Sequence, residues 1–336
     1  MSRATCQAAA TQLGRLATAQ SHPFVVVLHG GEPLLLGLAN LEYLISTLRT
    51  TLPPKSHISI QTNGTLIDRA ILDFCARVDV DISISLDGPQ RVHDGNRVGF
   101  DGKGTFDRVL RGISLLQAHP ESTRLFTGVL AVVDASSDPL EVYEFFKQLR
   151  PPSVDFIYKD GNHSRLPEGK TSHSTTECGQ WMVALLESYL ADPDPIPIRI
   201  LDDMIKLTLG GFGKKEGIGL TNYGVIVIDT DGSVTKNDTL KSSFDGADRF
   251  SDPWSVHAHD LVDILQSDEF SHYHAMQRPT NSTCLACAEL NVCGGGMTLH
   301  RWRDANGYDN PSVYCEDQKL LIRRIREQTA ALSGLK

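Results

Sequence analysis

Four of the seven cysteines lie close together near the end of the chain. Their spacing is Cys284-x2-Cys287-x5-Cys293, followed by Cys315. Four thiolates can hold a tetrahedral zinc ion or a [4Fe–4S] cluster, because both take four sulfur ligands. Zinc sites usually have two close pairs of cysteines, and only the first pair is close here, so the spacing favours a cluster. Unligated thiols that only pack in the interior are the alternative.

The residues around these cysteines support a metal site. Three glycines, Gly294, Gly295 and Gly296, directly follow Cys293. Glycine has no Cβ, so backbone N–H groups can come close to ligand sulfurs at this point. The remaining cysteines are scattered, and we interpret them as ordinary packing thiols: Cys6, Cys75 and Cys178.

A second candidate site follows three consecutive strands expected in the first half of the chain. Each strand leads into a short run of glycine and polar residues: Gly30-Gly31-Glu32-Pro33, Asn63-Gly64-Thr65 and Asp87-Gly88-Pro89. In (β/α) barrels the carboxyl ends of the strands line the active site. Glycine and Asn or Asp are also common in plain βα turns. Three such runs at consecutive strand ends favour a ligand site.

The elements that position these motifs alternate between strand and helix from about residue 24 to 160. This pattern predicts a parallel sheet covered by helices. The expected strands are Phe24–Leu28, His57–Gln61, Asp79–Ser85, Leu125–Val133 and Val154–Tyr158. The expected helices between them are Leu38–Thr51, Leu66–Val78, Thr105–Ala118 and Asp138–Leu149. A further helix, Ser2–Ala19, precedes every strand, so we predict a barrel that lacks its first strand.

The second half of the chain has a different character. A polar loop at 161–175 precedes a helix at 177–190 and a linker rich in Pro and Asp at 192–197. Residues 225–236 predict a β-hairpin that turns at Asp231-Gly232. Helices are expected at 259–266 and 316–332. We therefore predict three parts: a partial barrel at 1–175, a bridging helical segment at 176–220 and a metal-cluster domain at 221–336.

Composition excludes some functions. The chain has 336 residues and a net charge of −9, whereas nucleic-acid-binding proteins carry clustered Lys and Arg. No run approaches the roughly 18 apolar residues of a membrane span, and the start of the chain lacks the layout of a signal peptide. We expect a cytoplasmic protein with neither a nucleic-acid nor a membrane partner.

Together these motifs resemble a known family. Gly30-Gly31-Glu32-Pro33 resembles the motif that holds the amino group of S-adenosylmethionine (SAM) in radical SAM enzymes. The next landmarks of sulfatase-maturase-like members are similar to Gln61-Thr62-Asn63-Gly64, to Ser85-Leu86-Asp87-Gly88-Pro89 and to Arg97. The C-terminal cysteines resemble the SPASM domain. The FxsB-type branch, which includes makers of cyclophane crosslinks, is similar to the runs Tyr223–Leu240, His300-Arg301 and Asn310-Pro311-Ser312-Val313-Tyr314-Cys315.

The resemblance implies a fold, a reaction and partners. The fold would be α/β: a partial parallel (β/α) TIM-like barrel followed by a small SPASM-like iron–sulfur domain. The reaction would be abstraction of hydrogen from a side chain of a ribosomally made precursor peptide, with SAM as oxidant and crosslinking as the outcome. An electron donor protein is a possible partner. The SAM contacts would come from Gly30, Gly31, Glu32 and Pro33 at the amine end, and from Asn63, Ser85, Asp87 and Arg97 at the ribose and carboxylate.

The resemblance also locates a second set of positions. Full SPASM domains hold two auxiliary clusters, and the four cysteines here match the ligands of the second cluster. Asn237 and Met297 occupy positions that would serve the first cluster, so we predict one auxiliary [4Fe–4S] cluster. Asp238 matches a proposed substrate-side base of sulfatase maturases. A solvated turn residue is the alternative interpretation of Asp238.

One family motif is absent from residues 1–336. Radical SAM enzymes use a C-x3-C-x2-C loop to hold the cluster that cleaves SAM, and Cys6 stands alone near the start. We therefore expect the chain as written to be inactive in SAM cleavage. The missing loop has several explanations. One is that the chain is a piece of a complete maturase, and another is that it is a catalytically dead protein that binds a peptide or partner and keeps one structural or redox cluster. A zinc-stabilised α/β protein of another kind is the third.

Overall fold

The structure is a computed structural model that describes residues 1–333. Its main sheet contains five parallel strands in the order of the chain. They are β1 (Val25–Leu28), β2 (His57–Thr62), β3 (Val80–Ser85), β4 (Phe126–Val132) and β5 (Val154–Ile157). All five predicted strands are confirmed within two residues.

The strands have two different faces. In β2 and β3, the isoleucines Ile58, Ile60, Ile82 and Ile84 are fully buried. The alternating positions between them are Ser, Gln, Asp and Ser residues that are only half-buried. Successive side chains of a strand point to opposite faces, so one face of this sheet packs in the core and the other is polar. Closed TIM barrels fill their interior with branched apolar side chains, whereas this interior can receive a polar ligand.

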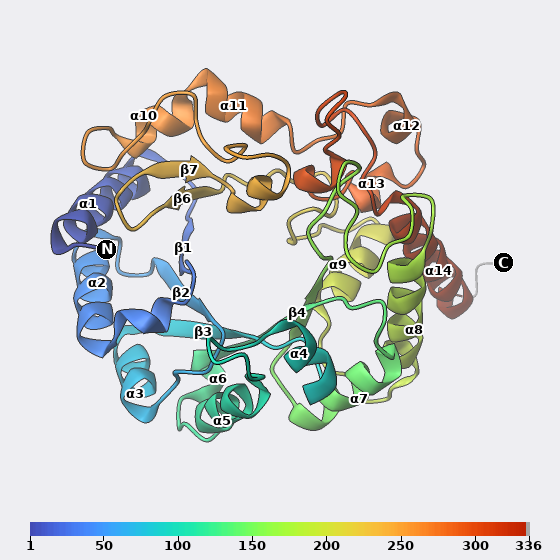
Figure 1. The fold of residues 1–336 in the computed structure, drawn as a ribbon, viewed down its shortest axis with the longest axis horizontal. Coiled ribbons are helices and arrows are strands. Elements are labelled where there is room, and N and C mark those ends of the chain that lie inside the picture. The colour runs from blue at the N-terminus through green and yellow to red at the C-terminus, as the bar shows by residue number, and fades with distance from the viewer. Residues whose placement is uncertain (334–336) are drawn as a thin grey trace.

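Helices cover the apolar face of the sheet in an arc (Figure 1). They are α2 (Leu38–Thr51), α3 (Arg69–Val78), α4 (Gln90–Asn96), α5 (Phe106–Gln117), α6 (Ser122–Leu125) and α7 (Pro139–Leu149). Side-chain caps begin several of them. Asp68 Oδ1 accepts Ile71 N at 2.8 Å before α3, and Asp138 Oδ1 accepts Leu140 N at 2.9 Å before α7. The short helices α4 and α6 were not predicted.

The first helix joins the start of the sheet region to the C-terminal half of the chain. α1 (Arg3–Ala19) precedes β1, as predicted, and packs against both α2 and α10 (Leu261–Gln266). Its approach to α2 is close, because a Cβ built on Gly14 would lie 2.8 Å from Thr51 O. Ala9 and Leu16 share a second hydrophobic core with residues of the C-terminal half. The elements therefore form a ring in which α1 and α10 meet (Figure 1).

Three long helices form the opposite side of the ring. α8 (Glu177–Ala191) and α9 (Arg199–Thr208) pack against α14 (Cys315–Ser333), and all three contribute side chains to the core of the sheet. α9 was not predicted. A buried ion pair joins the loop after β5 to α14, with Lys170 Nζ 2.6 Å from Asp317 Oδ2.

The C-terminal half begins with the predicted hairpin, β6 (Ile226–Ile228) and β7 (Val234–Lys236). Asp231 Oδ1 accepts Ser233 N at 2.9 Å, and Gly232 has a φ of 92° at the turn. The elements that follow are η2 (Asp238–Ser242), α10, α11 (Asp268–Ala275), α12 (Ser282–Leu285), α13 (Leu290–Cys293) and η3 (Thr298–Arg301).

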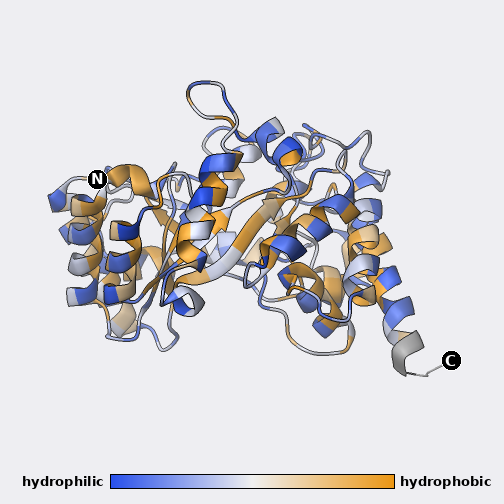
Figure 2. Cartoon of the chain, turned by 90° about the horizontal axis from the view of Figure 1, so that it is seen from below, coloured by the Kyte–Doolittle hydropathy of each residue, from blue (hydrophilic) through white to orange (hydrophobic). Residues whose placement is uncertain are grey.

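Figure 2 shows the hydrophobic residues concentrated on the strands at the centre, with helices that carry both hydrophobic and hydrophilic residues around them. Within residues 1–333, none of the helices combines the length and the apolar character that crossing a membrane requires.

Candidate functional site

Glu32 links the carboxyl ends of the first two strands. It lies between β1 and the 3-10 helix η1 (Pro33–Leu36). Its Oε1 accepts hydrogen bonds from Leu34 N at 3.0 Å and Thr62 Oγ1 at 2.6 Å, and its Oε2 accepts one from Asn63 N at 2.8 Å. Three donors therefore fix the position of this carboxylate at the edge of the sheet.

The glycines before Glu32 leave the backbone open. Gly30 and Gly31 are exposed, and a Cβ built on either of them meets no atom within 4 Å. Gly30 has a φ of 65°, a conformation that favours glycine. Pro33 begins η1, where a missing N–H costs little. The turn thus presents sterically open backbone beside a fixed carboxylate, which suits an amino group. The assignment of these residues to SAM stays a prediction.

Asn63 and Ser85 lie at the ends of β2 and β3. Asn63 Oδ1 accepts Thr65 N at 3.0 Å and Thr65 Oγ1 at 2.8 Å, which fixes the turn. Ser85 Oγ accepts Gln61 Nε2 at 2.9 Å across the two neighbouring strands. The hydroxyl of Ser85 can still donate to a ligand on the polar face.

Asp87 and Arg97 form an ion pair with each other. Arg97 Nε lies 2.6 Å from Asp87 Oδ2, Arg97 Nη2 lies 3.0 Å from Asp87 Oδ1, and Val132 N donates to the same Oδ1 at 3.0 Å. The Asp87 side chain is 4% exposed and that of Arg97 is 29% exposed. The guanidinium is therefore the accessible partner, and Asp87 orients it. Their contacts with SAM stay predictions.

Sequence reasoning missed a polar group inside the sheet. Asp81 accepts hydrogen bonds from Ser59 Oγ at 2.6 Å and also bonds to His57 Nε2. These residues alternate with the buried isoleucines of β2 and β3. The signal is present in the sequence as a period-2 alternation of polar and apolar residues along β2 and β3.

The four C-terminal cysteines come from separate short turns and one long helix. Cys284 lies in α12, Cys287 lies just after it, Cys293 ends α13 and Cys315 begins α14. They are close enough for a charge on one thiol to act on the others. The fold therefore brings the predicted ligands together from positions up to 31 residues apart, as the numbering shows. Their ligation stays a prediction.

Burial sets the protonation of these thiols. It raises the pKa of Cys293 to about 12 and that of Cys315 to about 11, and the neighbouring thiols act in the same direction. Both groups therefore hold their protons at neutral pH. Metal binding needs thiolates, so a bound metal centre must displace these protons.

The glycine run brings backbone close to the thiols, as expected from the sequence. Gly294, Gly295 and Gly296 have φ values of 66°, 86° and 71°. The backbone of Gly295 forms a hydrogen bond with the Cys293 thiol. A Cβ on Gly294 would lie 1.9 Å from Gly219 O, so this position requires glycine.

The donor set fits a cluster. Four thiols with a backbone hydrogen bond to one sulfur are the ligand pattern of [4Fe–4S] centres, although four thiolates also suit zinc. Among residues 1–333, no three His, Cys, Asp or Glu side chains converge as ligands of a single metal ion.

The other cysteines do not provide the loop of a SAM-cleaving cluster. Cys6 lies on α1, Cys75 on α3 and Cys178 on α8, and all three are buried. Three buried thiols on three separate helices do not form a C-x3-C-x2-C loop.

Asp238 is exposed at the first position of η2. The neighbouring Asn237 fixes this turn: its Oδ1 accepts Thr239 N at 3.1 Å and its Nδ2 donates to Glu216 Oε1 at 2.9 Å. Burial raises the pKa of Glu216, and the charge of Asp238 adds to this effect. The arrangement holds an accessible carboxylate, and its role as a base stays a prediction.

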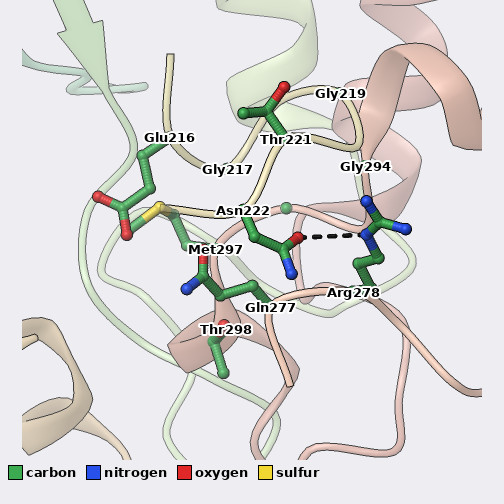
Figure 3. A pocket seen from close by; sticks show the side chains of 11 residues that line it. Glu216, Gly217, Gly219, Thr221, Asn222, Gln277, Arg278, Gly294, Met297 and Thr298 are labelled. Atoms are coloured by element: carbon green, nitrogen blue, oxygen red, sulfur yellow. Dashed lines mark hydrogen bonds between the residues drawn. The ribbon is translucent and has the colours of Figure 1, made fainter. Parts of the chain in front are cut away.

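A small pocket adjoins Glu216 and the cysteine region (Figure 3). Met297 lies against the backbone of Gly217, where a Cβ would be 2.7 Å from Met297 Sδ. Arg278 Nε donates to Asn222 Oδ1 at 3.3 Å at the same pocket (Figure 3). The two positions expected to serve a first auxiliary cluster, Asn237 and Met297, therefore both adjoin the segment that begins at Glu216. The pocket is lined by the carboxylate of Glu216, by side-chain amides and by the thioether of Met297. The prediction of one cluster remains untested.

Solved structures share this fold over the whole chain. Native anSMEcpe with bound AdoMet superposes with a TM-score of 0.83 at 21% identity, over 100% of this chain and 90% of that one. The same protein with AdoMet and the Cp18Cys peptide gives a TM-score of 0.85 at 20% identity, over 99% and 91%. The five-stranded sheet and the C-terminal half therefore correspond to the partial barrel and C-terminal domain of that enzyme.

Sequence comparisons agree with the fold. Residues 12–135 match the model of the radical SAM superfamily. A cysteine-type anaerobic sulfatase-maturating enzyme of Clostridium perfringens is 24% identical over 86% of this chain and 78% of that protein. A serine-type anaerobic sulfatase-maturating enzyme of Klebsiella pneumoniae is 36% identical over 82% of this chain and 68% of that protein. The chain belongs to the radical SAM/SPASM family that includes the anaerobic sulfatase-maturating enzymes.

Proposed function

We propose that this chain is a radical SAM/SPASM maturase that modifies a side chain of a peptide. The observation that carries the proposal is the Glu32 carboxylate, which three donors hold beside the open backbone of Gly30 and Gly31. This site lies within the segment that matches the superfamily. Relatives of known structure bind AdoMet together with the Kp18Cys or Cp18Cys peptide, which supports a peptide as substrate here.

In this proposal the strand ends bind SAM. Glu32 and the backbone of Gly30 and Gly31 accept hydrogen bonds from its ammonium group, because a carboxylate forms strong charge-assisted bonds with such a donor. Arg97, oriented by Asp87, binds its carboxylate as a guanidinium can. In a protein that carries the C-x3-C-x2-C loop, bound SAM would supply the oxidising radical after a reduced cluster on that loop gives it one electron, and that radical would remove a hydrogen atom from the peptide.

The polar face of the sheet and Asp238 belong to the substrate side. Asp238 is exposed and fixed by the Asn237 cap, so it can take a proton from the substrate. The finer proposal is a ribosomally made precursor peptide and a side-chain crosslink, supported by the likeness of the run before Cys315 to the FxsB-type branch. In that run, Asn310 Nδ2 donates to Arg301 O at 3.0 Å and so fixes the backbone that leads to Cys315.

The four cysteines hold an auxiliary [4Fe–4S] cluster in this proposal. With four thiolate ligands every iron is occupied, so the cluster supplies one-electron chemistry and leaves no iron for the peptide. An electron donor protein is then a partner of the maturase.

The test is SAM cleavage and metal content. The chain is purified without oxygen, loaded with iron and sulfide, and assayed for 5′-deoxyadenosine, both as written and with the in-frame codons upstream of Met1. We expect iron and acid-labile sulfide in both proteins, and 5′-deoxyadenosine from the one that carries a C-x3-C-x2-C loop. Glu32→Gln should lower that activity and leave the iron of the four-cysteine site unchanged.

A protein that contains the loop and its iron but makes no 5′-deoxyadenosine would contradict the maturase. A peptide- or partner-binding protein with one cluster would then be the better description. Metal analysis that finds zinc in place of iron would contradict the assignment of a [4Fe–4S] cluster to the four cysteines.

A further inference from the structure

Arg301 is a buried cation that interacts electrostatically with two of the four cysteines, Cys284 and Cys293. Its side chain lies in η3 and the residue is 1% exposed. Its Nη2 donates to Met276 O at 2.7 Å, Gln277 O at 3.0 Å and Thr298 Oγ1 at 3.1 Å. All three acceptors are neutral, so they satisfy N–H groups but do not offset the charge.

The guanidinium lacks a carboxylate partner in the part of the chain that the structure describes. No carboxylate oxygen of the described residues lies within 4.0 Å of an Arg301 nitrogen. Its Nε is buried and has no hydrogen-bond partner within that same part. Removing an unpaired charge from water costs several kcal/mol, so a buried guanidinium implies a compensating negative charge nearby.

The neighbouring groups identify where that charge can form. Cys284, Cys293 and Tyr308 are the ionisable groups whose negative forms act on Arg301. Burial raises the pKa of Tyr308, so this phenol stays neutral at physiological pH. A metal centre that converts the neighbouring thiols to thiolates would supply negative charge here.

We propose that Arg301 is the counter-charge of the four-cysteine centre and raises the reduction potential of the cluster bound there. This inference rests on the [4Fe–4S] assignment of the proposed function. A cluster held by four thiolates is anionic, and reduction adds one further negative charge. A fixed positive charge favours the reduced form, since net charge and hydrogen bonding set the potential of such clusters. Arg301 thus makes the cluster a better acceptor of one electron, without itself changing protonation.

Hydrogen bonds to the backbone link Arg301 to the segment that carries the ligand Cys315. Asn310 Nδ2 donates to Arg301 O at 3.0 Å, and Val313 N donates to His300 O at 2.8 Å. Both contacts belong to the segment that ends at Cys315, so the position of the cation is fixed by the same turn that presents the last ligand.

Two substitutions separate charge from hydrogen bonding. Arg301→Lys keeps a positive charge and N–H donors, whereas Arg301→Gln keeps an amide donor and removes the charge. Arg324→Gln is the matched control, because it removes the same charge from α14 at a side chain that is 35% exposed and paired with Glu187. Each protein is loaded with iron and sulfide, and the midpoint potential is measured by redox titration followed by electron paramagnetic resonance.

We expect Arg301→Gln to lower the midpoint potential by about 59 mV or more, which is a tenfold change in the ratio of reduced to oxidised cluster at a fixed potential. Arg301→Lys should shift it much less, and Arg324→Gln should leave it unchanged. If Arg301→Gln folds but loses its iron while Arg301→Lys keeps it, that result would also support the role of the positive charge as the counter-charge of the cluster.

Equal potentials in wild type and Arg301→Gln would overturn the inference. So would equal loss of iron in the Lys and Gln variants, because the hydrogen bonds to Met276 and Gln277 would then be the whole role of Arg301. A wild-type protein without an iron–sulfur signal would contradict the cluster itself, and metal analysis of the wild type detects that failure separately.

Discussion

Individual side chains at the strand ends act mainly by orienting one another. Glu32 is fixed by Thr62 and by the backbone of Asn63, and Arg97 is oriented by Asp87. Thr62 is 2% exposed, and its hydroxyl also accepts Gly64 N at 3.1 Å. One buried hydroxyl therefore couples the carboxylate to the turn after β2.

Replacement of this hydroxyl tests the coupling. Thr62→Val has nearly the same shape but leaves Glu32 without one donor and Gly64 N without its acceptor. Hydrogen bonds to charged groups contribute about 1.5–3 kcal/mol, so we expect a loss of that order in the free energy of unfolding, measured by urea denaturation. Thr62→Ser keeps the hydroxyl and should lose much less. Equal losses in the two variants would mean that the methyl group, not the hydroxyl, stabilises the turn.

The sequence identified the residues that carry chemistry better than the contacts between them. The cysteines and the Gly-Gly-Glu-Pro run could be predicted, because their types and spacing are local signals. The pairing of Asp87 with Arg97 and the bond between Glu216 and Asn237 were not predicted. Such contacts join residues from different turns, and no local pattern records which side chains meet.

At the scale of elements, the loop after α13 is built around a close backbone contact. A Cβ on Gly294 would lie 1.9 Å from Gly219 O, so the loop before β6 packs directly on the turn that follows Cys293. Only glycine permits both this approach and a φ of 66°. The same contact therefore positions a cysteine and one wall of the pocket in Figure 3.

We expect Gly294→Ala to lose most of its iron, because the added methyl group pushes Cys293 and Gly219 apart. Gly210→Ala is the matched control: Gly210 has a φ of 84° in open space, so it suffers the same backbone strain without a clash. Iron and sulfide analysis of the two purified proteins gives the comparison. Full iron content in Gly294→Ala would show that the loop adapts and that the contact is dispensable.

The elements that could be predicted from sequence are those with long, regular patterns. The five strands and the helices between them follow from alternating β-branched and amphipathic runs. α9 was missed because it directly follows a segment rich in Pro and Asp. α12 and α13 each have four residues. A helix of that length is too short to show a periodic pattern, and it depends on caps such as Asn281 Oδ1, which accepts Cys284 N at 2.9 Å.

At the scale of the whole molecule, a buried ion pair fastens the barrel to the helix that begins at Cys315. The side chains of Lys170 and Asp317 are both fully buried, and Asp317 also accepts Gly179 N at 2.7 Å. The loop after β5, α8 and α14 therefore meet at the carboxylate of Asp317, which lies two residues after the predicted cluster ligand Cys315.

Removing one partner of this pair should be costly. Lys170→Met leaves Asp317 as a buried unpaired charge, for which about 3–5 kcal/mol of stability is lost. The double variant Lys170→Met with Asp317→Asn removes the buried carboxylate charge and keeps an acceptor for Gly179. Only Glu177, whose Oε2 lies 3.7 Å from Lys170 Nζ and whose side chain is 28% exposed, then loses its cation, so the double variant should recover most of that loss. Denaturant unfolding of both proteins checks this. A double variant as unstable as Lys170→Met would mean that the Lys170 stem, not the charge balance, holds the junction.

The meeting of α1 with α10 has a consequence for how the protein is made. Thr5 Oγ1 lies 3.2 Å from His257 Nε2, and Gln12 Oε1 accepts Leu261 N, contacts that span 252 and 249 residues of sequence. Ribosomes add about 5–20 residues per second, so the first helix leaves the exit tunnel roughly 12–50 s before its partners. During synthesis its apolar side, with Ala9 and Leu16, is without half of its packing. The apolar side of α1 therefore stays partly uncovered until residues 257–261 have been made, and the ring closes only then.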